Sequence, residues 1–152
     1  MHKQSYAKFG LMILVSTLVM FALMYFNIFQ LNHIFFSETR AYMAVMMGAA
    51  MAFIMMGFMW KMYANRKVNA LILVCSAAVF GVSLWLVRSQ ATVDDVAWMK
   101  AMIPHHSIAV LTSERAHLSD PRVQDLANRI IEAQLREIDE MKGLIRSIES
   151  GS

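Results

Sequence analysis

Cysteine and glycine are scarce in this 152-residue chain. The single cysteine, Cys75, can form neither a disulfide nor a cysteine-based metal site within one chain. Only six glycines occur, and they form no phosphate-binding glycine loop. No nucleophile stands beside a candidate base either, so the sequence predicts a binding or structural protein and not an enzyme.

Charge is missing from three long segments. Residues 9–29, 41–60 and 68–87 each run without a charged side chain for about 20 residues, the length that a helix needs to cross roughly 30 Å of hydrocarbon. Hydrophobic residues make up 58% of the chain and its mean hydropathy is +0.47, which is too apolar for one soluble domain. We therefore predict three transmembrane helices within residues 1–88, the first an uncleaved anchor because it is too long for a signal peptide.

Acidic residues are almost absent from the first part of the chain. Residues 1–88 hold seven Lys/Arg and one acid, whereas residues 89–152 hold seven Lys/Arg and ten Asp/Glu. The soluble part has no basic stripe, so the net charge of +3 does not indicate a nucleic-acid partner. The basic loop at 61–67 predicts a multi-pass membrane protein with a cytoplasmic N-terminus and residues 89–152 on the opposite side of the membrane.

The segment after the third run shows helical spacing. Its apolar residues predict a helix from about Val93 to Leu118 that begins with a capping box of Thr92 and Asp95. Pro104 lies inside this helix, where it removes one backbone donor and should bend the axis.

The stretch "LSDPRVQDL" then predicts a turn and a second helix. Ser119 or Asp120 can cap that helix, Pro121 suits its first turn, and it should end near Ile148. Its predicted apolar seam consists of Val123, Ala127, Ile130, Gln134, Glu137 or Ile138, Met141, Leu144 and Ile148.

A turn this short makes the two helices antiparallel neighbours, so residues whose numbers sum to about 239 should face each other. The facing pairs are then His106 with Gln134, Met102 with Glu137, and Met99 with Met141 or Glu140. Two helices of this size cannot cover their own apolar face. We expect a homo-oligomer, with a dimer forming a four-helix bundle, or docking on the membrane part.

The stretch "WMKAMIPHHSIAV", residues 98–110, combines thioether and imidazole donors. Met99 and Met102 precede His106 by seven and four residues, on one side of a helix, and His105 is adjacent. Thioether sulfur favours Cu(I), imidazole binds either oxidation state of copper, and zinc sites rarely use methionine. These residues are therefore candidate copper ligands.

The second helix contributes to the same candidate site. Met141 is a further candidate ligand, while Gln134 and Glu137 are candidates for orienting an imidazole from behind. The same residues also suit plain helix packing, because a histidine on an apolar face is usually a hydrogen-bonded core residue and methionine a common filler. Spacing alone does not decide between the two interpretations.

Two other patterns invite a metal interpretation. Glu114 and His117 match the Glu-x-x-His step of di-iron bundles. In the antiparallel pairing predicted above, however, the residues that face them include Arg122, whose positive charge disfavours a bound cation. Methionines also recur every four residues in the second span, as a ladder for Cu(I) or as packing filler. The ladder consists of Met43, Met47, Met51, Met55 and Met59.

The stretches "DDVAWMKAMIPHHSIAV" and "DPRVQDLANRIIEAQLREIDEMKGLI" together resemble the bacterial domain-of-unknown-function 305 family over about residues 94–145. The resemblance implies a ferritin-like helical fold, membrane anchoring or export, and a link to copper binding and copper tolerance. It marks as site residues Met102, His105, His106, Gln134, Glu137 and Met141. The chain departs from the family pattern at Ser107 and at Leu111-Thr112. This part of the helix therefore has fewer side chains that could bind a metal ion.

The sequence thus predicts an all-α protein with three transmembrane helices, residues 1–88, followed by a soluble antiparallel helical hairpin, residues 89–152. Its predicted function is copper binding at the periplasmic face of the membrane, with a copper-handling protein as a further partner. One rival is a structural module that assembles with a membrane partner. Another is a copper transporter that uses the methionine ladder.

Overall fold

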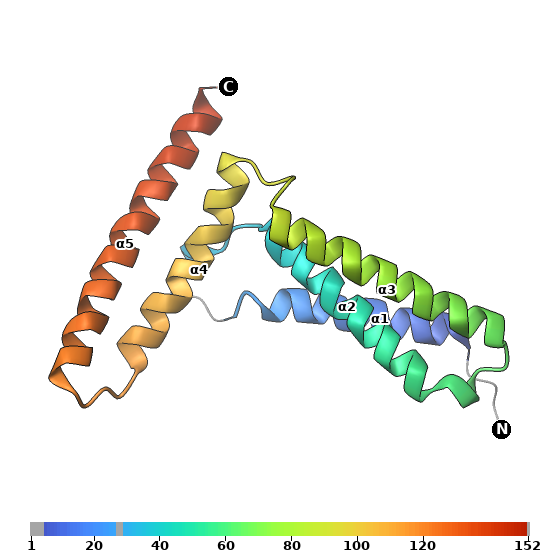
Figure 1. Ribbon diagram of the computed structural model, residues 1–152. Coiled ribbons are helices and arrows are strands. Elements are labelled where there is room, and N and C mark those ends of the chain that lie inside the picture. Colours follow the sequence, from blue (N-terminus) through green and yellow to red (C-terminus); the bar gives the residue numbers. More distant parts are fainter. Residues whose placement is uncertain (1–4, 27–28, 152) are drawn as a thin grey trace. The chain divides into compact units, whose positions relative to one another are not determined.

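The computed structural model describes residues 5–26 and 29–151. Every regular element in that part of the chain is helical, as predicted, and no strand occurs there (Figure 1). The elements are α1 (Tyr6–Leu23), η1 (Leu31–His33), α2 (Glu38–Phe58), η2 (Trp60–Met62), α3 (Arg66–Ser89), α4 (Asp95–Arg115) and α5 (Pro121–Ser150).

The helices belong to two compact units. The first contains the chain up to Met24 together with Thr39–Thr92, and the second contains Tyr25–Glu38 together with the chain from Val93 onward. The segment 25–38 therefore belongs with α4 and α5, although it lies between α1 and α2 in sequence. The predicted domain boundary between residues 88 and 89 had assigned this segment to the first unit.

Three helices of the first unit, α1, α2 and α3, are long and apolar enough to cross a membrane, as the uncharged runs predicted. The predicted end of the first span at Phe29 is wrong, because α1 ends at Leu23 and Met24 caps it. The Tyr25 hydroxyl then accepts a hydrogen bond from the backbone N–H of Ser37, at 3.1 Å, so the chain leaves the helix here. Residues 27 and 28 of the predicted span lie outside the described residues.

Small residues let α1 and α2 approach closely. Ala44, Gly48 and Ala52 are buried at four-residue steps along α2. A Cβ added at Gly48 would collide with Oγ1 of Thr17 on α1. This is the small-xxx-small pattern of packed membrane helices.

A polar network closes one end of this unit. Asn69 of α3 is fully buried, and its side-chain amide donates to the backbone oxygens of Trp60 and Tyr63. Its Oδ1 accepts a hydrogen bond from the Tyr6 hydroxyl, at 2.8 Å. Because each polar group of Asn69 has a partner, its burial is compatible with an apolar surrounding.

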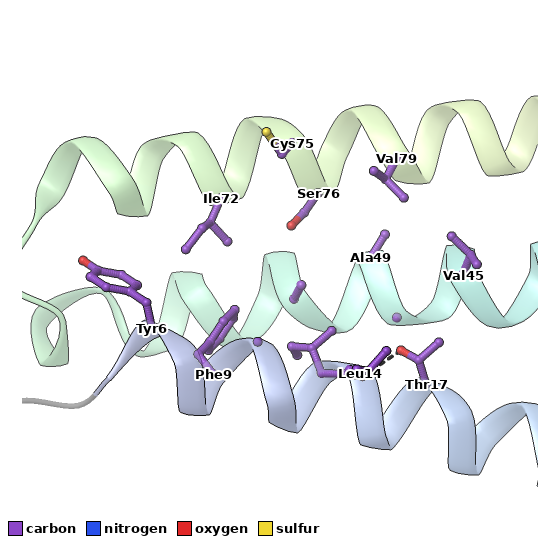
Figure 2. Close-up of a pocket in the computed structure, with 14 residues that line it drawn as sticks. Tyr6, Phe9, Leu14, Thr17, Val45, Ala49, Ile72, Cys75, Ser76 and Val79 are labelled. Carbon is purple, nitrogen blue, oxygen red and sulfur yellow. Dashed lines mark hydrogen bonds between the residues drawn. The ribbon is translucent and has the colours of Figure 1, made fainter.

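An apolar hollow of about 460 Å³ lies among α1, α2 and α3 (Figure 2). Phe9, Ile72 and Val79 line it, and the polar groups at its wall are few. One of these, the Thr17 hydroxyl, already donates to the backbone oxygen of Ile13. Among the residues that the structure describes, no charged side chain lines the hollow.

The methionine ladder runs along α2 outside the buried face. Met43 is exposed, and Met47, Met51, Met55 and Met59 are half-buried. The fully buried methionine of this helix is Met56, which is not part of the ladder. Conduction of an ion along the ladder stays a prediction.

The second unit is built around the pairing of α4 with α5, which lie side by side (Figure 1). Their shared core consists of Met99, Ile103, Ile138, Met141 and Ile145, with Phe35, Val96 and Met102 packed against it. The predicted seam on α5 is partly wrong. Val123, Ile130, Leu144 and Ile148 are exposed, because the single neighbour α4 covers a narrower strip than the whole apolar face.

A candidate metal site on the α4–α5 helix pair

The start of α4 differs from the predicted capping box. The N-cap is Asp94, whose carboxylate accepts a hydrogen bond from the backbone N–H of Ala97 at 2.7 Å. A carboxylate is a strong acceptor for the free amides of a first helical turn. Thr92, the predicted cap, instead lies 2.9 Å from the hydroxyl of Tyr42.

The start of α5 confirms one of the two predicted caps. Asp120 is the N-cap, its carboxylate accepts from the backbone N–H of Arg122, and Pro121 is the first helical residue. The Arg122 side chain also donates to this carboxylate and lowers the pKa of Asp120 below its ordinary value. Both helix starts are therefore anchored by aspartate, which fixes where each helix begins.

The predicted register between the helices is shifted. His106 faces Glu137 and not Gln134, while Lys100 pairs with Glu149. Helix α4 ends at Arg115, and five residues, 116–120, lead to α5. The predicted register assumed a shorter turn at Ser119–Asp120. The longer connection offsets the two helices along their axes.

His106 and Glu137 form the central polar contact of the pair. The imidazole Nε2 lies 2.7 Å from a carboxylate oxygen of Glu137. The His106 side chain is 15% exposed and that of Glu137 is 48% exposed. Glu137 therefore contacts the ring from the more exposed side, and its role in orienting a metal-binding imidazole stays a prediction.

The other ring nitrogen of His106 has no partner. Nδ1 is buried, and within the described residues it is the one buried side-chain nitrogen or oxygen without a hydrogen bond. Buried polar atoms are normally satisfied, so an orphaned one requires an explanation. When the Nε2–H donates to Glu137, Nδ1 carries a free lone pair, and a metal-bound histidine commonly has this arrangement with a carboxylate behind it.

Two methionines line a surface hollow together with His106. A surface hollow of about 230 Å³ opens beside His106. Its wall consists of Trp98, Met99, His106, Glu137, Glu140, Met141 and Leu144. The structure thus brings together four of the seven predicted site residues, two from each helix.

The remaining three predicted residues lie apart from this hollow. His105 is exposed, and its ring centroid is 6.2 Å from that of His106 with the planes at 62°. Met102 is half-buried and packs against the shared core, and Gln134 is half-buried without lining the hollow. His105 directly precedes His106, and this one-residue step rotates its side chain by about 100° around the helix.

Charged and imidazole donors are few at this site. Among the described residues, no group of three or more His, Cys, Asp or Glu side chains could hold a metal ion. The His106–Glu137 pair with its two methionines is thus a donor set rich in sulfur, which suits a soft ion better than a hard one. The di-iron interpretation requires Glu114 and His117 to lie one turn apart on the same helix. Helix α4 ends at Arg115, so His117 lies outside it and the interpretation is wrong.

A buried histidine elsewhere in this unit was not predicted as a site residue. His33 is 3% exposed, and its Nδ1 lies 3.0 Å from Oγ of Ser107. The same hydroxyl oxygen accepts the backbone N–H of Phe29, at 2.6 Å. Burial lowers the pKa of His33, and nearby Lys142 lowers it further, while Asp139 opposes both.

Ser107 has no room to act as a nucleophile, since it is fully buried by these contacts. Its role in this structure is to join the segment 25–38 to α4. The departure from the family pattern at this position was the one signal in the sequence, and it did not reveal which residues contact Ser107.

Comparisons with known proteins bear on the C-terminal part of the chain. An uncharacterized protein of Acanthamoeba polyphaga mimivirus is 35% identical over 75 residues, which are 48% of this chain and 49% of that protein. The chain therefore spans about half the length of the curated relative that it matches. No solved structure matches. Residues 87–151 match the family model described as Domain of unknown function (DUF305), which supports the family resemblance for the segment that carries α4 and α5.

Proposed function

We propose that this chain is a membrane-anchored protein that binds copper on the α4–α5 helix pair and serves in copper homeostasis or tolerance. The observation that carries the proposal is the buried, unpartnered Nδ1 of His106, a residue that lines the same hollow as Met99 and Met141. An imidazole nitrogen with thioether sulfurs is a donor set that favours Cu(I) over zinc or magnesium.

Each residue has a separate role in this proposal. His106 binds through Nδ1, while Glu137 accepts the Nε2–H and thereby fixes the ring orientation. Met99 and Met141 supply sulfur from opposite helices. His105 and Met102, which do not line the hollow, serve at most as secondary ligands.

The proposed location is the bacterial inner membrane, with α4 and α5 in the periplasm. Three helices long and apolar enough to cross a membrane support the anchoring. The basic loop between α2 and α3, with Lys61, Arg66 and Lys67, supports a cytoplasmic position for that loop. A reporter fused to the C-terminal end that is active only in the cytoplasm would overturn this orientation.

The test of the metal preference uses the full chain in lipid nanodiscs. Titration against a chromophoric chelator should give tight binding of Cu(I) and weak binding of Zn(II). Replacing both Met99 and Met141 by leucine keeps their volume and should weaken Cu(I) binding strongly, with little effect on Zn(II). Equal affinity of the wild type for the two ions would contradict a thioether site.

The rival function is a structural module, and the ion pair itself favours it. In that case His106 and Glu137 only fix the register of α4 against α5, as polar core residues do in some helical assemblies. A module of this kind would bind no metal stoichiometrically, and His106→Gln would lower its stability without any effect of copper.

A further inference from the structure

Two sides of the α4–α5 pair differ in what covers them. The segment 25–38 covers one side, where Phe35 packs against the shared core and His33 contacts Ser107. A second side carries the His106–Glu137 contact and leaves a row of apolar side chains between 37% and 49% exposed. This row, the α5 stripe, consists of Val123, Leu126, Ile130, Leu144 and Ile148.

The stripe is aligned with Glu137 along one line of the helix. At about 100° per residue, Leu126, Ile130, Leu144 and Ile148 lie within roughly 20° of the direction of Glu137. Glu137 is thus the polar centre of an otherwise apolar row. An exposed row of this length on a well-formed helix usually marks a contact surface.

The order of residues in the stripe is symmetric about Glu137. Ile130 and Leu144 lie seven residues on either side of it, and Leu126 and Ile148 lie eleven residues on either side. When two copies of α5 run antiparallel with their Glu137 residues at the centre, Ile130 meets Leu144 and Leu126 meets Ile148, each pair twice. A surface that matches its own reversed copy is what a two-fold dimer requires.

Charge on the edge of the stripe agrees with the same pairing. Arg136 and Glu140 both lie on the same side of the stripe, at its edge. In the antiparallel arrangement, Arg136 of each copy comes close to Glu140 of the other. The edge therefore attracts a second copy and does not repel it.

We propose that a second copy of this chain docks on the α5 stripe, antiparallel and centred on Glu137, and completes the metal site. One chain supplies one imidazole and one carboxylate at the hollow, and no group of three such donors exists within the described residues. Two copies place two His106–Glu137 pairs, each with its adjoining methionine-lined hollow, on either side of the two-fold axis. This inference rests on the proposed function for its ligand, but the docking register stands on the stripe alone.

Cysteine cross-linking of the full chain in nanodiscs tests the register without metal. In a Cys75→Ala background, the double variant Ile130→Cys/Leu144→Cys should form a covalent dimer on mild oxidation. The matched control, Ile130→Cys/Ile148→Cys, has cysteines of the same helix shifted by one turn and should cross-link at least ten times less. Equal cross-linking of both variants, or none in either, would overturn the proposed docking.

Copper stoichiometry tests the shared site and separates the two proposals. The account predicts one Cu(I) per two chains in the wild type, and Leu126→Glu/Ile130→Glu should abolish both the dimer and the tight binding. Tight binding of one Cu(I) per chain by a monomer would overturn the shared site and leave the proposed function intact. Register-specific cross-linking without any copper binding would leave the dimer intact and overturn the proposed function.

Discussion

Removing the hydroxyl of Ser107 should release the segment 25–38 from α4. The Ser107→Ala variant deprives the partly buried Phe29 N–H and the buried His33 ring of their shared partner. An unsatisfied buried polar group costs about 1–3 kcal/mol. With about 1 kcal/mol for the partly buried amide in addition, the local free energy of opening should fall by about 2–4 kcal/mol. At one factor of ten per about 1.4 kcal/mol, the open population rises about 30-fold to 1000-fold.

Hydrogen exchange of the full chain in nanodiscs measures this opening in peptides that cover residues 29–38. The matched control is Thr112→Val, which removes a hydroxyl of the same helix that bonds only the backbone oxygens of Ile108 and Ala109 within its own helix. The control should leave exchange in the segment unchanged. If Ser107→Ala exchanges no faster than Thr112→Val, the hydroxyl does not hold the segment and the reasoning fails.

Two further outcomes follow from the packing. Because burial lowers the pKa of His33 below its ordinary 6.5, the folded unit favours the neutral ring; attachment of the segment should be strongest above that pH and weaken as the pH falls below it. Exchange at pH 5.5 and 7.5 measures this, and a pH effect unchanged in His33→Asn would refute it. Gly48→Ala should destabilise the packing of α1 on α2 by about 1–3 kcal/mol because its Cβ meets Thr17, whereas Gly57→Ala has open space; equal unfolding of the two variants in detergent titrations would refute it.

The helices were predictable because their signals are local. Uncharged runs identified α1, α2 and α3, and the aspartate before Pro121 identified the start of α5. The end of α1 was missed because apolarity continues beyond Leu23, while the chain leaves the helix to join the other unit. Hydropathy records where a residue prefers to be and not which unit it packs in.

The candidate site was only partly predictable for the same reason. Helical spacing placed Met99 beside His106 correctly, because both lie on one helix. The partner of His106 depends on how far α4 and α5 are offset along their axes. The five-residue connection sets that offset, and helical periodicity does not indicate it. The contact between His33 and Ser107 joins residues 74 positions apart, and no local sequence pattern indicates it.

The most direct test of the central claim is the Cu(I) affinity of single variants of the full chain in nanodiscs. His106→Ala should nearly abolish tight binding, and Glu137→Gln, which weakens the support behind the ring, should lower affinity by about 10-fold to 100-fold. His117→Ala removes an exposed histidine outside the hollow and should bind like the wild type. Tight Cu(I) binding that survives in His106→Ala would contradict the account.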